Sequence, residues 1–192
     1  NGDLVSSLFL VGSANTVNSA DNPGALFVKE VELEIGGQRI DKQSGHWMEL
    51  WAELTEPNSA GVCADPGNLG SGTSIHNGTK FQNMTGYGGV DVGSVPATIR
   101  MNIPLQFWFC RNPGLALPLI ALQYHEVKVI MTTAASTQLT SITKNELWAD
   151  YIYLDTDERR RFAQVSHEYL IEQVQEESWS SSDKTLNFNH PV

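Results

Sequence analysis

The sequence predicts an all-β protein, an antiparallel sandwich of two packed sheets, and three observations support this prediction. Several short segments alternate apolar and polar residues, turn signals separate them, and only a short stretch has clear helical spacing. The chain of 192 residues is 41% hydrophobic and 18% charged, which is typical of a folded globular protein and excludes general disorder. A chain of this length buries about 70% of its unfolded surface.

The strongest strand signal covers residues 99–110. Apolar residues occupy every odd position from Ile99 to Phe109, which is the pattern of a strand with one buried face. Pro104 has no backbone N–H to donate, so we expect an edge strand or a bulge at this position.

A β-hairpin is predicted for residues 27–43. Val31 and Leu33 lie on an apolar face of its first strand, and three glutamates lie on the opposite face. Gly36-Gly37 supplies the positive φ angles of a tight turn. Residues 4–11 are apolar on both faces and are expected to be buried on both sides. The other predicted strands are residues 121–132, 147–155, 166–175 and 186–189.

One amphipathic helix interrupts the strand pattern. The apolar residues at helical spacing are Trp47, Leu50, Trp51 and Leu54. Ser44 is the expected N-cap, and Pro57 is expected to stop the helix. Farther along, Asp155 and Glu158 resemble a capping box that opens a short turn through residues 159–162.

Residues 55–98 are predicted to form a long exposed surface loop. Nine of the sixteen glycines lie there among Asn, Ser, Thr and Asp. A loop of this length in a compact domain is usually functional or disordered. Two N-glycosylation sequons begin in it, at Asn77 and Asn83, and they are inert if the protein never enters the secretory pathway.

Charge and cysteine content exclude several classes of protein. Twelve basic against twenty-two acidic residues give a net charge of −10, which argues against nucleic-acid binding. The arginines at 159–161 are predicted to be solvated or to form intersubunit salt bridges with the acidic residues 168–177. No apolar run is long enough for a membrane helix, and no secretory signal is visible. Cys63 and Cys110 make no disulfide framework, so we expect a reducing compartment.

No constellation of residues predicts catalysis, a metal site or a cofactor. The adjacent pairs that begin at His125 and His167 point to opposite faces of a strand and cannot converge on one ion. His46 and Glu49 have helical spacing but lack a third ligand. Cys110 has no histidine partner and is predicted to be a quiet, partly buried thiol. We therefore predict that the protein is not an enzyme.

Four long blocks of the sequence resemble the major capsid proteins of the nucleocytoplasmic large DNA viruses. The blocks occur in the family's order and cover much of the chain outside residues 55–98. They are VELEIGGQRIDK (31–42), NPGLALPLIALQYHEV (112–127), DYIYLDTDERRRFAQ (150–164) with HEYLIEQ (167–173), and LNFNHP (186–191).

The resemblance implies a double jelly roll, two tandem antiparallel sandwiches in one subunit. Residues 1–156 would form most of the first jelly roll, without its opening strands. Residues 157–164 would form a linker turn, and residues 165–192 would open the second jelly roll. On this expectation the chain is part of a longer protein, and residues 55–98 form one of the loops on the outer face of the shell.

The function implied by the resemblance is structural. Homotrimers with a pseudo-hexagonal outline would tile an icosahedral shell, contacting neighbouring capsomers and minor capsid proteins. We expect no direct nucleic-acid binding and no membrane insertion, which is compatible with an internal virion membrane beneath the shell. The expected location is the virion capsid, assembled in the host cytoplasm. The alternative is a carbohydrate-binding sandwich, which requires Tyr87 or Trp108 to be exposed beside a polar cleft.

Overall fold

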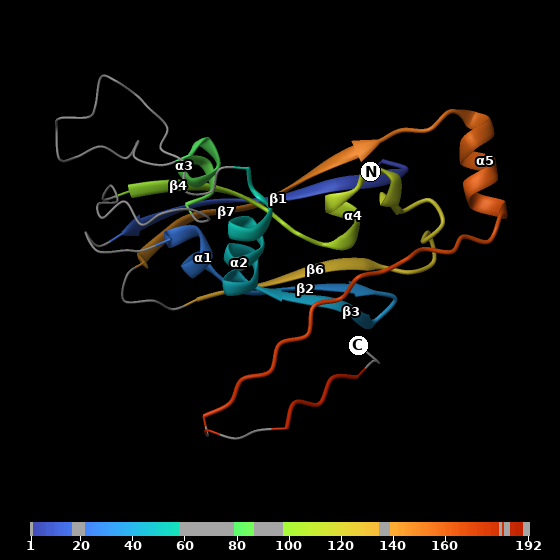
Figure 1. The fold of residues 1–192 in the computed structure, drawn as a ribbon. Helices are drawn as coiled ribbons and strands as arrows, with labels where there is room; N and C mark the ends of the chain where they lie inside the picture. Colours follow the sequence, from blue (N-terminus) through green and yellow to red (C-terminus); the bar gives the residue numbers. More distant parts are fainter. Residues whose placement is uncertain are drawn as a thin grey trace.

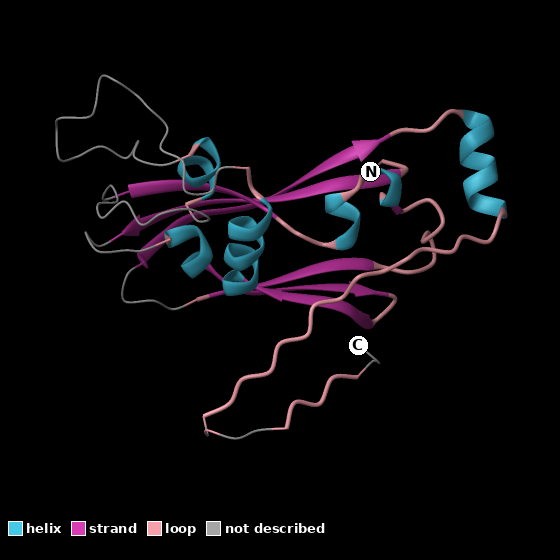
Figure 2. Ribbon diagram, in the orientation of Figure 1, coloured by secondary structure: helices cyan, strands magenta, loops and turns pink. Residues whose placement is uncertain are grey.

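Two antiparallel sheets face each other in the computed structural model, which describes residues 2–16, 22–57, 79–86, 98–134, 139–180, 182 and 185–189. Short helices lie beside the sheets and at one end of the molecule (Figures 1 and 2). The predicted all-β antiparallel sandwich is therefore confirmed.

The first sheet, sheet A, is organised around β1 (Leu4–Thr16). The long strand β7 (Leu139–Ile152) pairs with one edge of β1 over nearly its whole length. The other edge pairs with β4 (Thr98–Pro104) and with the two-residue β5 (Leu117–Pro118). Within the described residues β4 pairs only with β1, so the edge strand expected from Pro104 is confirmed.

The second sheet, sheet B, has β2 (Val28–Ile35) between β3 (Gln38–Ser44) and β6 (Val127–Thr133). The turn between β2 and β3 is the predicted one, because Gly36 and Gly37 have φ angles of 59° and 82°. Residues with side chains disfavour this backbone conformation, which explains the paired glycines.

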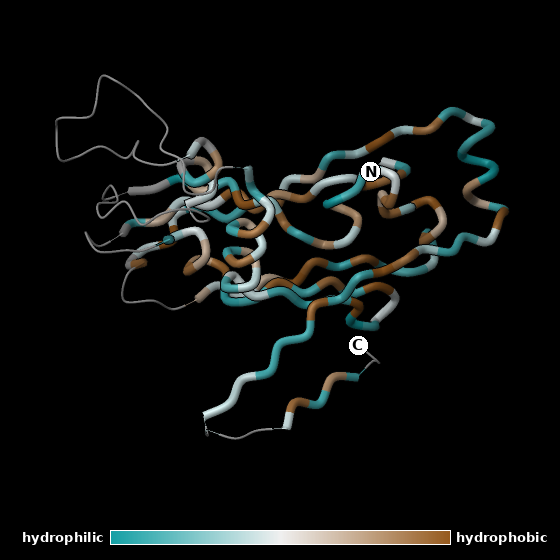
Figure 3. The backbone as a smooth tube through the Cα atoms, in the orientation of Figure 1, coloured by the Kyte–Doolittle hydropathy of each residue, from teal (hydrophilic) through white to brown (hydrophobic). Residues whose placement is uncertain are grey.

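The core lies between the two sheets and under the helices. Its large apolar side chains that are fully buried come from β2, β4, the segments beside them and one helix, and each stabilises the fold by about 1.5–3 kcal/mol. They are Phe27, Val28, Val31, Leu33, Met48, Met101, Ile103, Leu105, Phe107 and Phe109. Figure 3 shows hydrophobic residues recurring along the strands and mainly hydrophilic residues along α5.

The predicted helix is confirmed as α2 (Gly45–Thr55). The Ser44 hydroxyl accepts a hydrogen bond from the backbone N–H of Trp47 at 3.1 Å, as expected of an N-cap. Gly45 is required because a Cβ atom there would lie 2.1 Å from the carbonyl oxygen of Ala25 in α1 (Pro23–Phe27). The glycine thus allows the start of α2 to approach α1 closely.

The predicted strand 99–110 is wrong in its second half. The strand ends at Pro104, and the chain then turns into α4 (Trp108–Arg111) and the short 3-10 helix η1 (Pro113–Leu115). Phe107, Trp108 and Phe109 are all buried. A strand exposes alternate side chains on opposite faces, whereas a helical turn lets three consecutive aromatic residues reach the core.

Other strand predictions also need correction. Residues 119–125 form turns, so the strand expected at 121–132 begins only at Val127. Residues 4–11 are not buried on both sides, since Phe9 and Val11 are only half-buried. Residues 166–175 and 186–189 form irregular chain and do not pair as strands. The expected turn after Asp155 is a nine-residue helix, α5 (Thr156–Gln164).

The segment expected as one long loop, residues 55–98, is described only at its ends and at residues 79–86. The described middle part contains the helix α3 (Lys80–Thr85). Thr79 caps this helix by accepting a hydrogen bond from the backbone N–H of Gln82, and the Gln82 and Thr85 side chains are buried. This part of the predicted loop is therefore ordered against the body of the protein.

Candidate assembly surfaces

An extended arm, residues 165–180, follows α5 and runs back along β3 (Figure 1). Its backbone N–H at Val174 donates to Asp41 Oδ1 at 3.0 Å, and the Gln173 side chain donates to the carbonyl of Ile40. The Ser44 hydroxyl donates to Glu176 Oε2 at 2.8 Å. The arm is thus held to sheet B by a short row of hydrogen bonds.

Asp41 is the central acceptor of this contact. Its carboxylate also accepts from the backbone N–H of Lys42 at 2.9 Å and from Gln43 Nε2 at 3.0 Å. Burial raises the pKa of Asp41, because loss of solvent outweighs these hydrogen bonds and the charge of Arg111. Gln43 Nε2 also donates to the carbonyl of Gln106 at 2.8 Å, which links β3 to the chain after β4.

Arg111, the last residue of α4, supplies a second attachment for the arm. Its guanidinium lies 4.6 Å from the ring centroid of Trp51 in α2 and 2.9 Å from Glu172 Oε2 in the arm. The side chain is only 16% exposed, which strengthens both the cation–π contact and the ion pair. Arg111 therefore joins two helices and the arm.

The arginine run lies on α5 and is held within the same chain. Arg159 pairs with the buried carboxylate of Asp3 at 3.0 Å, and Arg160 lies 3.8 Å from Asp157. Asp3 also accepts from the backbone N–H of Leu154 at 2.8 Å. None of the described residues of α5 is buried, so the Arg159 ion pair is a main contact of this helix with the sandwich.

The candidate metal ligands do not form one cluster; His46 and Glu49 interact electrostatically on α2, but no third ligand among the described residues joins them. Glu49 accepts a hydrogen bond from the Asn22 side chain, and burial raises its pKa. His167 contacts the carbonyl of Phe162 at 2.8 Å and stacks on its ring, closing the end of α5. His125 is exposed beside Gly36. Within the described ranges no group of three or more His, Cys, Asp or Glu side chains is arranged to hold a metal ion.

The remaining candidate residues either lie within helices and the core or are outside the described residues. Cys110 is a half-buried free thiol in α4, and burial raises its pKa to about 11, so it is protonated at neutral pH. Trp108 is 3% exposed and packs edge-on against Phe109, with 5.2 Å between ring centroids. Asn83 lies within α3. Cys63, Asn77 and Tyr87 lie outside the described residues.

Sequence reasoning missed Asp3, Asp41 and Arg111. The position of Asp41 carried a signal, because it pairs with the buried Leu33 across the hairpin, and Gln43 pairs with Val31. Two polar residues on the buried face of a strand indicate a hydrogen-bonded network. No helix in the described part of the chain is long and apolar enough to cross a membrane.

Known proteins match the chain throughout its length. The family model for the N-terminus of the major capsid protein matches residues 1–155. The major capsid protein of Pyramimonas orientalis virus is 48% identical over 206 positions, which cover 100% of this chain and 48% of the relative. The major capsid protein of Paramecium bursaria Chlorella virus 1 is 37% identical, with coverage of 100% and 45%. The chain spans about half the length of these relatives.

Solved capsid structures share the fold. A quasi-atomic model of the PBCV-1 virus capsid matches with a TM-score of 0.69 and 36% identity, covering 90% of this chain and 41% of that chain. PBCV-1 VP54, fitted into a reconstruction of the virophage Sputnik, matches with a TM-score of 0.68 and 35% identity over 90% of this chain and 41% of that one. The two-sheet architecture is therefore the jelly-roll sandwich of a viral capsid protein. The chain belongs to the family of major capsid proteins of the nucleocytoplasmic large DNA viruses.

Proposed function

We propose that the protein is a structural subunit of a virion shell, without enzymatic activity, that self-assembles into homotrimeric capsomers. The observation that carries this proposal is the match to major capsid proteins over the whole chain, combined with the jelly-roll sandwich. Pseudo-hexagonal trimers then tile an icosahedral shell and contact neighbouring capsomers and minor capsid proteins. The subunit makes no direct contact with nucleic acid, and its final location is the virion capsid after assembly in the host cytoplasm.

The arrangement of the chain supports a tandem organisation. We divide it into a first jelly roll (1–156), a linker (157–164) and the opening of a second jelly roll (165–192). In support, none of the residues of α5 is buried, and residues 165–180 lie outside both sheets. The exposed apolar side chains of this segment, among them Leu170 and Trp179, are of the kind that a second sandwich covers.

A carbohydrate-binding function has weaker support. Sugar-binding sandwiches present aromatic rings beside polar groups; the two candidate rings are Tyr87, which lies outside the described residues, and Trp108. Because Trp108 is buried in the core, its ring cannot stack against a sugar. We therefore do not propose carbohydrate binding.

Native mass and particle outline test the proposed function. The full-length protein is expected to give the mass of three copies by light scattering and a hexagonal silhouette by negative-stain electron microscopy. A stable monomer with no tendency to assemble at any ionic strength would contradict the proposal.

A further inference from the structure

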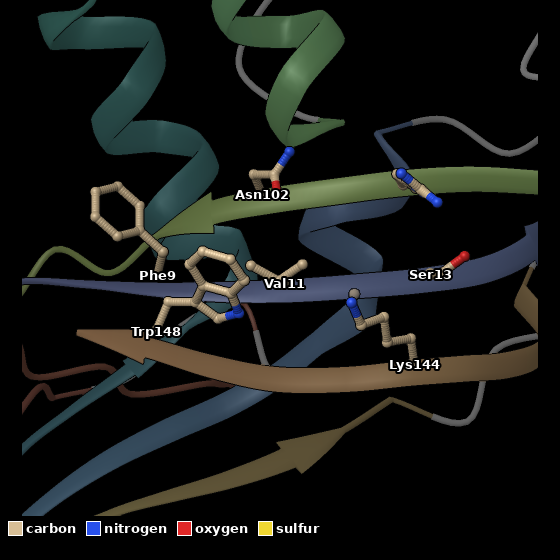
Figure 4. Close-up of a pocket in the computed structure, with 8 residues that line it drawn as sticks. Phe9, Val11, Ser13, Asn102, Lys144 and Trp148 are labelled. Atoms are coloured by element: carbon tan, nitrogen blue, oxygen red, sulfur yellow. The ribbon is translucent and has the colours of Figure 1, made fainter.

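A shallow groove of about 400 Å³ lies on the outer face of sheet A (Figure 4). Three adjacent strands, β4, β1 and β7, form its floor, and its side chains point away from the core. The strand register orders these side chains in three rows. The rows are Arg100–Ser13–Lys144, Asn102–Val11–Glu146 and Pro104–Phe9–Trp148.

One end of the groove is apolar. Trp148 is 59% exposed, although its indole N–H already donates to Glu146 Oε2 at 2.9 Å. Phe9 and Val11 beside it are half-buried. The hydrogen bond restrains the indole, so covering the ring costs little conformational entropy. Tryptophan and arginine are the residue types that most often dominate the energy of protein–protein contacts.

The other end of the groove is positively charged. Arg100 is exposed and forms no ion pair with any described residue. Lys144 lies 3.0 Å from Glu146 Oε2, the same oxygen that accepts from Trp148. Two cations and one carboxylate leave this surface with an excess of positive charge, on a chain whose net charge is −10. A second copy, with its net charge of −10, carries an excess of acidic side chains that can pair with the cations of the groove.

We infer that this groove is a contact surface for a second copy of the chain, which covers Trp148 and places acidic side chains against Arg100 and Lys144. The inference rests on the proposed self-assembly and names a surface that takes part in it. Groove-to-groove contact would bring like charges together, so the contact joins the groove to a different surface of the neighbouring copy. Head-to-tail contacts of this type form a ring when the rotation between copies closes, so the contact is compatible with a trimer and not with a two-fold dimer.

Two substitutions in the full-length protein test the inference: reversal of the charge at Arg100 and removal of the Trp148 ring. Arg100→Glu and Trp148→Ala are each expected to raise the concentration needed for assembly at least tenfold, with an unchanged melting temperature. Lys29→Glu and Tyr124→Ala are matched controls at exposed positions outside the groove, and both are expected to assemble like the wild type. Groove variants that assemble normally, or controls that fail equally, would overturn the inference.

Photo-crosslinking identifies the occupant directly. A Ser13→p-benzoylphenylalanine variant is expected to give a product of twice the chain mass, joined to an acidic peptide of the second copy. A product with a different protein, or none in the assembled state, would overturn the inference. Failure of the wild type to assemble refutes the proposed function itself. If the wild type assembles and the groove variants assemble equally well, only the role of the groove as a contact surface is refuted.

Discussion

At the scale of single residues, Asp41 shows how one buried carboxylate joins parts of the chain that are distant in sequence. It accepts hydrogen bonds from Lys42, Gln43 and Val174. Asp41→Ala leaves these donors without their acceptor and is expected to lower the free energy of unfolding by about 1–3 kcal/mol. Guanidinium denaturation measures this difference, and an alanine variant as stable as the wild type would contradict the role of Asp41.

The raised pKa of Asp41 also determines the direction in which its contribution to stability changes with pH. Because the folded state holds the proton more tightly than the unfolded chain, this group contributes most stability below its unfolded pKa. That contribution is lost as pH rises through the folded pKa. Asp41→Asn keeps one acceptor and cannot ionise, so its stability relative to the wild type is expected to improve between pH 3 and pH 7. Guanidinium denaturation of both proteins across this pH range measures the difference in stability.

At the scale of the elements, sequence patterns predicted what local chemistry determines. The hairpin turn at Gly36-Gly37 and the cap at Ser44 were predictable because a few adjacent residues specify each of them. The error at residues 105–110 has a tertiary cause. The core accepts three consecutive aromatic side chains there, and the alternation of Phe107 and Phe109 is equally compatible with a strand.

The cap of α2 gives a prediction for an element. Ser44→Ala removes the acceptor for the Trp47 N–H and the donor to Glu176, and is expected to cost about 0.5–2 kcal/mol of stability. Ser44→Thr keeps the hydroxyl and serves as the matched control. It is expected to lose much less stability than Ser44→Ala. Thermal unfolding of both variants checks the prediction. Equal losses would show that the hydroxyl is not what stabilises the start of α2.

At the scale of the whole molecule, the pairing of strands far apart in sequence was beyond prediction from local pattern. The pairing of β1 with β7 and of β2 with β6 connects segments that no turn signal relates. Arg111 likewise gave no sequence signal, because its partners Trp51 and Glu172 lie on other elements. The resemblance blocks identified the family, whereas the contacts of Arg111 with Trp51 and Glu172 were visible only in the structure.

The attachment of the arm gives a prediction for the whole molecule. Arg111→Ala removes both the cation–π contact with Trp51 and the ion pair with Glu172. Because the arm then retains mainly its hydrogen bonds to β3, limited proteolysis within residues 165–180 is expected to become several-fold faster. Glu172→Gln removes the charge pair alone and is expected to have a smaller effect in the same direction.

A surface ion pair elsewhere provides the control for this experiment. Lys128→Ala breaks the exposed pair with Glu34 at 3.4 Å, on the edge strand of sheet B opposite β3, and the arm keeps its attachment to Arg111. Its arm is expected to be cut at the wild-type rate. Equal cleavage rates for Arg111→Ala and the wild type would mean that Asp41 and the backbone of β3 hold the arm without Arg111. Faster cleavage confined to Arg111→Ala and Glu172→Gln would identify α4 as the element that fixes the arm against the sandwich.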